Sequence, residues 1–345
     1  MKLHVYAMAV FMMLTVSNIG AQPNPVLLDV DPGIDDALAI LLAVRSPELQ
    51  VEGITVVAGN VEVDVGVRNT LQVLELAGRT DIPVARGAEA PLLGMLITAE
   101  HVHGDNGLGN IQLPPPSTKL YEGSAVDLIA AKVKEHSGDI ILIPVGPLTN
   151  IALALKLHPD LVTHIKQIVL MGGSTSGGNI TAAAEFNIYN DPEAAEIVFK
   201  SGIPIIMVGL DVTLQTVLTP QYLETGSVAD DPVARLVKGL TDFQNARGDQ
   251  GVFLHDPLAV GVAIDPSFVK TQPGYVEVET RGEKTRGETT FDRRTYGVGF
   301  EKRGRKRIAV REDPPTPNAQ VCLAVEADRF VRFFLERVAQ GTGAR

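Results

Sequence analysis

The sequence has no tryptophan, few other aromatic residues and a single cysteine among its 345 residues. One cysteine, Cys322, rules out an internal disulfide and a zinc site built from cysteines, and its apolar neighbours predict a place in the core. Aromatic residues make up 5% of the chain and hydrophobic residues 45%, so the expected core is large and mostly aliphatic. Positive charge is also scarce, and the net charge of −11 argues against nucleic acid or an anionic membrane surface as a partner.

The first 21 residues differ in character from the rest of the chain. Lys2 gives a positive start, residues 5–16 are almost all apolar, and the segment ends with the small residues Gly20 and Ala21. This pattern is typical of a cleaved secretory signal peptide, and its apolar part is short for a membrane span. An uncleaved anchor and a buried first strand are the alternatives. We predict a periplasmic or secreted protein with no membrane attachment after cleavage, in which residues 22–345 form one domain.

Segments expected to form strands alternate with segments expected to form helices. The expected strands are 26–29, 49–57, 83–85, 140–145, 165–171 and 203–208. The expected helices are 35–45, 63–77, 125–136, 148–157 and 192–200. This alternation predicts an α/β domain with a mostly parallel open sheet and helices on both faces. Ligands of such domains bind at the carboxyl ends of the strands.

The last third of the chain is less regular. Helices are expected over 233–246, 256–264 and 328–338, and the alternation in 276–279 predicts an edge strand. Residues 281–311 are rich in Arg, Lys, Gly and Thr, which indicates a solvated loop or hairpin, with an interaction patch as the alternative.

Four carboxylates lie within eight residues near the start of the predicted domain. Asp29, Asp31, Asp35 and Asp36 follow the first expected strand and precede an apolar helix, with a turn at Pro32-Gly33. Like charges at this spacing repel one another unless a cation lies among them, and carboxylate oxygens suit Ca²⁺ or Mg²⁺.

Two alternatives for the acidic cluster remain open from the residues alone. Aspartates at the start of a helix can act as caps and interact favourably with the helix dipole. Asp29 and Asp31 also have the spacing of a phosphatase nucleophile and its neighbour at a strand end. An EF-hand fits poorly, because the sixth position from Asp29 is Ile34 instead of glycine.

Further polar residues follow other expected strands, on the same edge of the sheet. The positions that could contact a ligand there are Asn60, His103, Asn179, Glu185, Asn187, His255 and Asp256. Each has a local alternative as a turn residue or a cap. His101 and His103 are expected in a loop, with one possible substrate contact between them. The weight of the interpretation therefore rests on their joint occurrence.

These residues resemble the signature of the nucleoside hydrolase family. Residues 29–36 match every fixed position of Asp-x-Asp-Pro-Gly-x-Asp-Asp. The resemblance extends from about residue 25 to 340, and its remaining matches are 57–60, 103–104, 146–150, 171–173, 179, 185–187 and 255–257. An ordered set of this kind is far more specific than any one of its parts.

The resemblance implies a ligand set and an activity. It implies that Asp31, Asp36, Asp256 and the carbonyl oxygen of Val145 bind Ca²⁺. The implied reaction is hydrolysis of the N-glycosidic bond of a nucleoside by water, with Asp31 as general base and inversion at C1′. It also implies a homo-oligomer, a dimer or a tetramer.

The resemblance also implies roles for the remaining site residues. Asp35 and Asn60 contact the ribose, and Asn187 acts on the sugar or metal side of the catalytic centre. The 5′-hydroxyl end of the sugar is held by Asn179 and Glu185. On the base side are His103 and His255, the latter as leaving-group acid. The alternative function is an exported nucleoside-binding protein without turnover.

Two features depart from the family pattern. Residues 243–249, on the base side, lack the tyrosines found in some members, and Phe243 and Asn245 stand in that region. The base preference is therefore left open. The basic segment 301–311 is longer than is common in the family, and no role is assigned to it.

Overall fold

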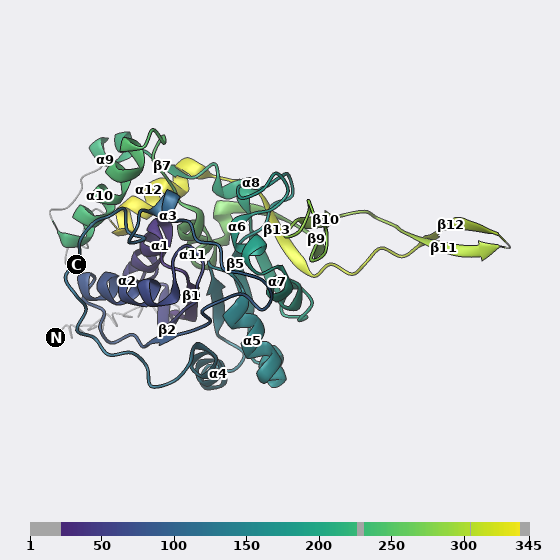
Figure 1. Ribbon diagram of the computed structural model, residues 1–345, viewed down its shortest axis with the longest axis horizontal. Helices are drawn as coiled ribbons and strands as arrows, with labels where there is room; N and C mark the ends of the chain where they lie inside the picture. Colours follow the sequence, from purple (N-terminus) through teal and green to yellow (C-terminus); the bar gives the residue numbers. More distant parts are fainter. Residues whose placement is uncertain (1–21, 226–230, 304, 339–345) are drawn as a thin grey trace, which may run out of the picture.

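A nine-stranded sheet forms the centre of the computed structural model, which describes residues 22–225, 231–303 and 305–338 (Figure 1). The predicted signal peptide, residues 1–21, lies outside the described residues. The strand order is β10-β9-β13-β6-β5-β4-β1-β2-β3. The strands are β1 (Asn24–Val30), β2 (Leu49–Val56), β3 (Val84–Arg86), β4 (Ile141–Pro144), β5 (Gln167–Met171), β6 (Ile205–Val208), β9 (Val269–Val278), β10 (Thr289–Asp292) and β13 (Ala319–Val325).

Most of the sheet is parallel, as the sequence predicts. The strands from β3 through β13 in the spatial order run parallel, and β9 and β10 add two antiparallel strands at one edge. Both faces are covered: in β1, Leu28 and Val30 pack in one cluster of buried side chains and Leu27 in another. Strands that are buried on both faces need apolar side chains at nearly every position, and this produces the continuous apolar runs in the sequence.

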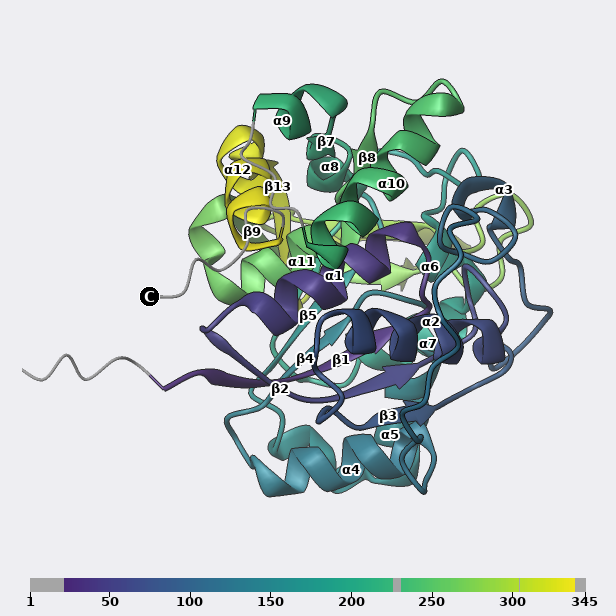
Figure 2. The ribbon, with the colours of Figure 1, turned by 90° about the vertical axis from the view of Figure 1, so that its left-hand side faces the viewer.

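The helices divide between the two faces (Figure 2). One face is covered by α1 (Ile34–Arg45), α2 (Val63–Leu76), α11 (His255–Ile264) and α12 (Ala327–Val338). The other is covered by α4 (Ala125–Glu135), α5 (Thr149–Leu157) and α7 (Pro192–Phe199). Within the described part of the chain, no helix combines the length and apolarity needed to cross a bilayer.

Several short elements and one longer helix lie mainly near one rim of the sheet and on the first face. They are α3 (Glu100–His103), α6 (Phe186–Asn190), α8 (Leu210–Thr213), α9 (Pro220–Thr225), α10 (Pro232–Ala246), the 3-10 turns Pro159–Thr163 and Pro266–Phe268, and the pair β7 (Val217–Leu218) and β8 (Val252–Phe253). The loop expected around His101 and His103 is in fact the short helix α3, so that expectation was wrong.

Two further expectations concern the last third of the chain. The strand expected over 276–279 is present, because residues 276–278 belong to β9, but its position at the edge was wrong. β9 lies between β10 and β13, since residues 289–292 of the basic segment supply β10 outside it. The basic segment also forms a hairpin, β11 (Gly297–Arg303) and β12 (Lys306–Glu312), which confirms one of its two expected forms. Cys322 is buried in β13, as predicted.

Candidate active site

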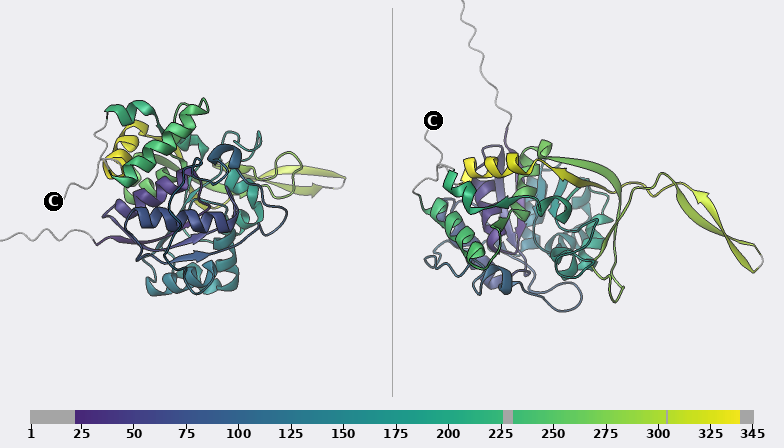
Figure 3. Two further views of the ribbon diagram at one scale, coloured as in Figure 1. Left: turned by 60° about the vertical axis from the view of Figure 1, so that its left-hand side comes forward. Right: turned by 90° about the horizontal axis from the view of Figure 1, so that it is seen from above.

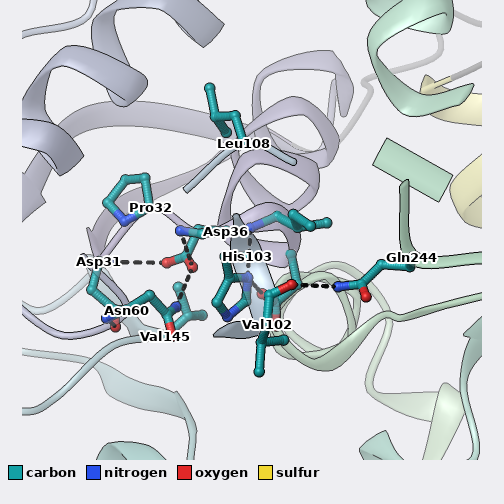
Figure 4. Close-up of polar contacts among 12 residues, drawn as sticks. Asp31, Pro32, Asp36, Asn60, Val102, His103, Leu108, Val145 and Gln244 are labelled. Atoms are coloured by element: carbon teal, nitrogen blue, oxygen red, sulfur yellow. Dashed lines mark hydrogen bonds and ion pairs between the residues drawn. The ribbon is translucent and has the colours of Figure 1, made fainter. Parts of the chain in front are cut away.

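The turn between β1 and α1 is held by one carboxylate. Asp36, in the first turn of α1, accepts hydrogen bonds from the backbone N–H groups of Asp31 and Gly33, each at 3.0 Å (Figure 4). A carboxylate that binds N–H groups left free at a helix start stabilises the turn and fixes its own position. Asp36 therefore has the capping role that the sequence left open, and its position is fixed within the acidic cluster.

Asp31 lies in a space that only glycine neighbours leave open. Its Oδ2 atom accepts a hydrogen bond of 2.7 Å from the backbone N–H of Asn60. A Cβ atom at Gly59 would lie 2.1 Å from Oδ2, and one at Gly146 would lie 2.5 Å from Oδ1. The loops after β2 and β4 thus need glycine where they approach this carboxylate. Oδ1 is buried and has no hydrogen-bond partner among the described residues.

A third carboxylate reaches the cluster from a distant part of the sequence. Asp256, in the first turn of α11, lies beside the start of α1, and oxygen atoms of Asp35, Asp36 and Asp256 lie within 4.8 Å of one another. Burial and repulsion from Asp36 raise the pKa of Asp35 to about 8. Burial, followed by repulsion from neighbouring carboxylates, also holds the pKa values of Asp31 and Asp256 well above their usual range. Without a cation, this cluster would hold protons.

The donor set fits a hard divalent cation. Every side-chain donor is a carboxylate oxygen, and the Oδ1 atoms of Asp31 and Asp35 are buried with no hydrogen-bond partner in the part of the chain that the structure describes. The carbonyl oxygen of Val145 accepts a 2.7 Å hydrogen bond from Asn187 Nδ2 and keeps a second lone pair. Oxygen donors of this kind are those that Ca²⁺ and Mg²⁺ take in proteins, and a cation would offset the repulsion among the buried acids.

A pocket of about 360 Å³ opens beside the acidic cluster. Nine of the residues predicted from the sequence line it: Asp35, Asn60, His103, Val145, Asn179, Glu185, Asn187, His255 and Asp256. The predicted metal ligands Asp31 and Asp36 do not line it; both are fully buried and are hydrogen-bonded to Asn60, which does. The structure thus brings the predicted residues to one place, although it does not test the role of each.

Two histidines on the pocket wall are held in the neutral form. His103 Nδ1 accepts a 3.0 Å hydrogen bond from the backbone N–H of Ile34, and burial lowers the pKa of His103 to about 3. His255 stacks on Phe253 at 5.4 Å between ring centres, and its Nδ1 lies 2.8 Å from Thr213 Oγ1. Burial lowers the pKa of His255 to about 4. Both imidazoles are therefore uncharged near pH 7.

The residues predicted to hold the far end of the sugar also organise the loop before α6. Glu185 accepts hydrogen bonds from the N–H groups of Gly173, Asn187 and Ile188, at 3.0, 2.9 and 3.1 Å. Asn179 Oδ1 accepts one of 2.9 Å from the N–H of Phe186. These bonds position the side chains at the pocket wall.

Sequence reasoning missed part of the pocket. Gln244, Arg247 and Asp249 line it, whereas Phe243 and Asn245, the two residues singled out in this region, do not. Gln244 Nε2 donates to the carbonyl of Val102 at 3.2 Å, and Arg247 donates to the carbonyl of His101. Gln244 and Arg247 are three positions apart at the end of α10, which puts them on one helix face. That spacing was the available signal.

Asp29 does not belong to this pocket. Its carboxylate is fully buried and accepts hydrogen bonds from Thr55 Oγ1 at 2.6 Å and Asn150 Nδ2 at 2.8 Å. A nucleophile must reach its substrate, so this placement disfavours the phosphatase alternative.

Comparison with known proteins gives a consistent result. The family described as inosine-uridine preferring nucleoside hydrolase matches residues 26–332. The pyrimidine-specific ribonucleoside hydrolase RihA of Shewanella woodyi is 46% identical over 281 residues, 80% of this chain and 89% of that protein. The protein of the same name from Salmonella schwarzengrund is 42% identical over 320 residues, 91% of this chain and 98% of that protein.

Solved structures agree with the sequence relatives. A purine-preferring ribonucleoside hydrolase from Gardnerella vaginalis is similar with a TM-score of 0.77 and 38% identity, over 91% of this chain and 97% of that one. The plant nucleoside hydrolase PpNRh1 is similar with a TM-score of 0.83 and 35% identity, over 92% of this chain and 100% of that one. Relatives named for pyrimidine and for purine nucleosides are thus both found at this level of similarity.

Proposed function

This chain belongs to the inosine-uridine preferring nucleoside hydrolase family, and on that premise we propose that it hydrolyses ribonucleosides to free base and ribose in a Ca²⁺-dependent reaction. The observation that carries the calcium proposal is the group of buried carboxylates beside the pocket, two of whose oxygens have no hydrogen-bond partner within residues 22–225, 231–303 and 305–338. Asp31, Asp36, Asp256 and the carbonyl of Val145 would hold the ion, which supplies Lewis-acid activation of water when bound.

Individual residues of the chain have separate proposed roles in the reaction. Asp31 is proposed as the general base, because its Oδ1 atom is free to take a proton from the attacking water while Oδ2 is held by Asn60. Asp35 accepts a ribose hydroxyl, and Asn187, fixed by the carbonyl of Val145, orients the sugar. The negative groups under the ring stabilise the positive charge that develops at C1′. Direct attack by water predicts inversion.

His255 is proposed as the donor to the departing base. If Nδ1 accepts the hydroxyl proton of Thr213, the N–H at Nε2 of the neutral ring can donate a hydrogen bond to the negative charge that develops on the departing base. We expect His255→Ala to lower kcat on uridine by about 10²- to 10⁴-fold, the usual range for general-acid catalysis. A riboside with a nitrophenolate leaving group needs no protonation and should lose much less. Equal losses on both substrates would contradict the assignment.

A preference for pyrimidine nucleosides is proposed from the names of the sequence relatives, which are more similar to this chain than the purine-preferring one. The test is release of ribose from uridine, cytidine, inosine, adenosine and guanosine. We expect the highest kcat/KM on uridine or cytidine. A higher value on inosine would overturn the preference, and turnover of none would favour the alternative function, a nucleoside-binding protein.

Two further expectations are proposals about the whole protein. Export rests on residues 1–21, and a cytosolic protein that keeps Met1 would contradict it. The mature domain is proposed to span residues 22–345 and to form a homo-oligomer, which measurement of its mass in solution would test.

A further inference from the structure

The hairpin formed by β11 and β12 projects far from the rest of the protein. Residues 297–312, called the arm below, lie at the end of two connecting segments beyond the β9–β10 edge of the sheet (Figures 1 and 3). An isolated two-stranded hairpin is only marginally stable in water, and a third strand or a packing surface is usually needed. Because the arm is long and lies away from the rest of its own chain, we expect it to pack on another molecule.

One face of the arm has the chemistry of a contact surface. In an antiparallel pair, residues directly opposite each other share a face, so Val298 with Arg311, Phe300 with Ala309, and Lys302 with Arg307 form one side. Phe300 is 59% exposed and Val298 is 42% exposed. This set of six residues is called the aromatic face. Of the three large apolar side chains that are exposed on the arm, Val298 and Phe300 lie on this face and Ile308, at 38% exposed, lies on the other. Exposed apolar side chains grouped in this way indicate a protein partner.

The cations of this face are not paired with any acidic residue that the structure describes. Lys302, Arg307 and Arg311 form no ion pair with any described residue, whereas Arg303, on the opposite face, pairs with Glu301 at 3.2 Å. Arg307 instead lies over the ring of Phe300, at 5.1 Å from its centre. The aromatic face thus presents apolar and positively charged groups together, which suits an acidic protein surface.

The rest of the chain, called the body below, is itself strongly acidic. The arm contains six lysines and arginines and two glutamates, a net charge of +4, so the rest of the chain carries −15 of the total of −11. Two arms would repel each other, whereas an arm and a body attract. Each copy of the chain carries one arm and one acidic body, so two copies can supply each other with both.

We propose that the arm docks through its aromatic face on the body of a second copy of this chain, so that two copies exchange arms in a reciprocal dimer. Such an exchange makes each contact twice and closes the assembly. The inference rests on the proposed homo-oligomer and names its contact surface. It is independent of the hydrolysis, because no described residue of the arm lines the pocket beside the acidic cluster.

Two matched double substitutions test the proposal by sedimentation equilibrium. Lys302→Glu with Arg307→Glu reverses a cross-strand pair on the aromatic face, and Arg303→Glu with Lys306→Glu reverses the adjacent pair on the opposite face. Both change the net charge by the same amount. We expect the first to raise the dimer dissociation constant at least tenfold, and the second to change it by less than about threefold.

A variant with the arm replaced by a short glycine linker should be a monomer that still hydrolyses uridine, which separates this proposal from the proposed function. When mixed with the full chain, it should form a mixed dimer through the one remaining arm. A dimer that survives removal of the arm would overturn the arm contact while keeping the homo-oligomer, and a monomeric full chain would overturn both. Equal effects of the two double substitutions would also overturn the proposal. A mass that falls on nuclease treatment would overturn it too, because nucleic acid bound to the basic arm would then be holding the copies together.

Discussion

Asp31→Asn is expected to lower kcat on uridine by about 10²- to 10⁴-fold, the range of a lost general base. An amide cannot take the proton of the attacking water, although it fits the same space between Gly59 and Gly146. The acceptor for the N–H of Asn60 is also kept by the remaining carbonyl oxygen. The loss should therefore appear in kcat, and KM should change little.

Asp29→Asn is the matched control for this experiment. Asp29 is two positions away and equally buried, but its carboxylate is hydrogen-bonded by Thr55 and Asn150. The carboxylate of Asp31 is instead hydrogen-bonded by Asn60, which lines the pocket. We expect its kcat to stay within about tenfold of the wild-type value, below the range expected for a lost general base. A larger loss in Asp29→Asn than in Asp31→Asn would contradict the assignment and revive Asp29 as a nucleophile.

Calcium is expected to stabilise the folded protein, and Asp256→Asn is expected to remove most of that effect. A ligand that binds only the folded state at about 100 times its Kd stabilises it by about 2.7 kcal/mol. Asp256 is the proposed ligand that comes from the later part of the chain, and it lies within 4.8 Å of Asp35 and Asp36. Its loss should therefore weaken the binding of Ca²⁺.

The measurement is the melting temperature with a chelator and with added Ca²⁺. In the wild type, Tm should rise with calcium concentration, and in Asp256→Asn the rise should need much higher concentrations. With the chelator present, the variant should melt no lower than the wild type, because a buried Asp256 without a cation must either repel its neighbours or take up a proton, and an amide at this position does neither. A wild-type Tm that is insensitive to Ca²⁺ would argue against a calcium site.

Much of the fold is visible in the sequence, because the parallel strands are buried on both faces and read as apolar runs. The acidic turn after β1 can also be predicted from the sequence, since Asp31 and Asp36 are needed there at a fixed spacing. The position of β9 was misjudged because the neighbour that covers it, β10, comes from a polar, arginine-rich segment with no strand pattern of its own. Edge pairing depends on tertiary contacts that local patterns do not encode.

The pocket also contains residues that the sequence predicts and residues that it does not. Asp256 and His255 were found because a motif marks them, whereas Gln244 and Arg247 have no motif and lie at the pocket only because α10 ends beside α3. Their place at the pocket depends on how α10 packs against α3, which the sequence pattern of α10 alone does not show. The roles of individual ligands remain predictions.

The most direct test of the account is the rate of ribose release from uridine by the mature chain after treatment with a chelator, before and after Ca²⁺ is restored. The account predicts that turnover falls to background without the metal and returns when Ca²⁺ is added, because the buried carboxylates then hold an ion beside the pocket. Full turnover in the chelator, or no turnover with Ca²⁺ bound, would contradict it.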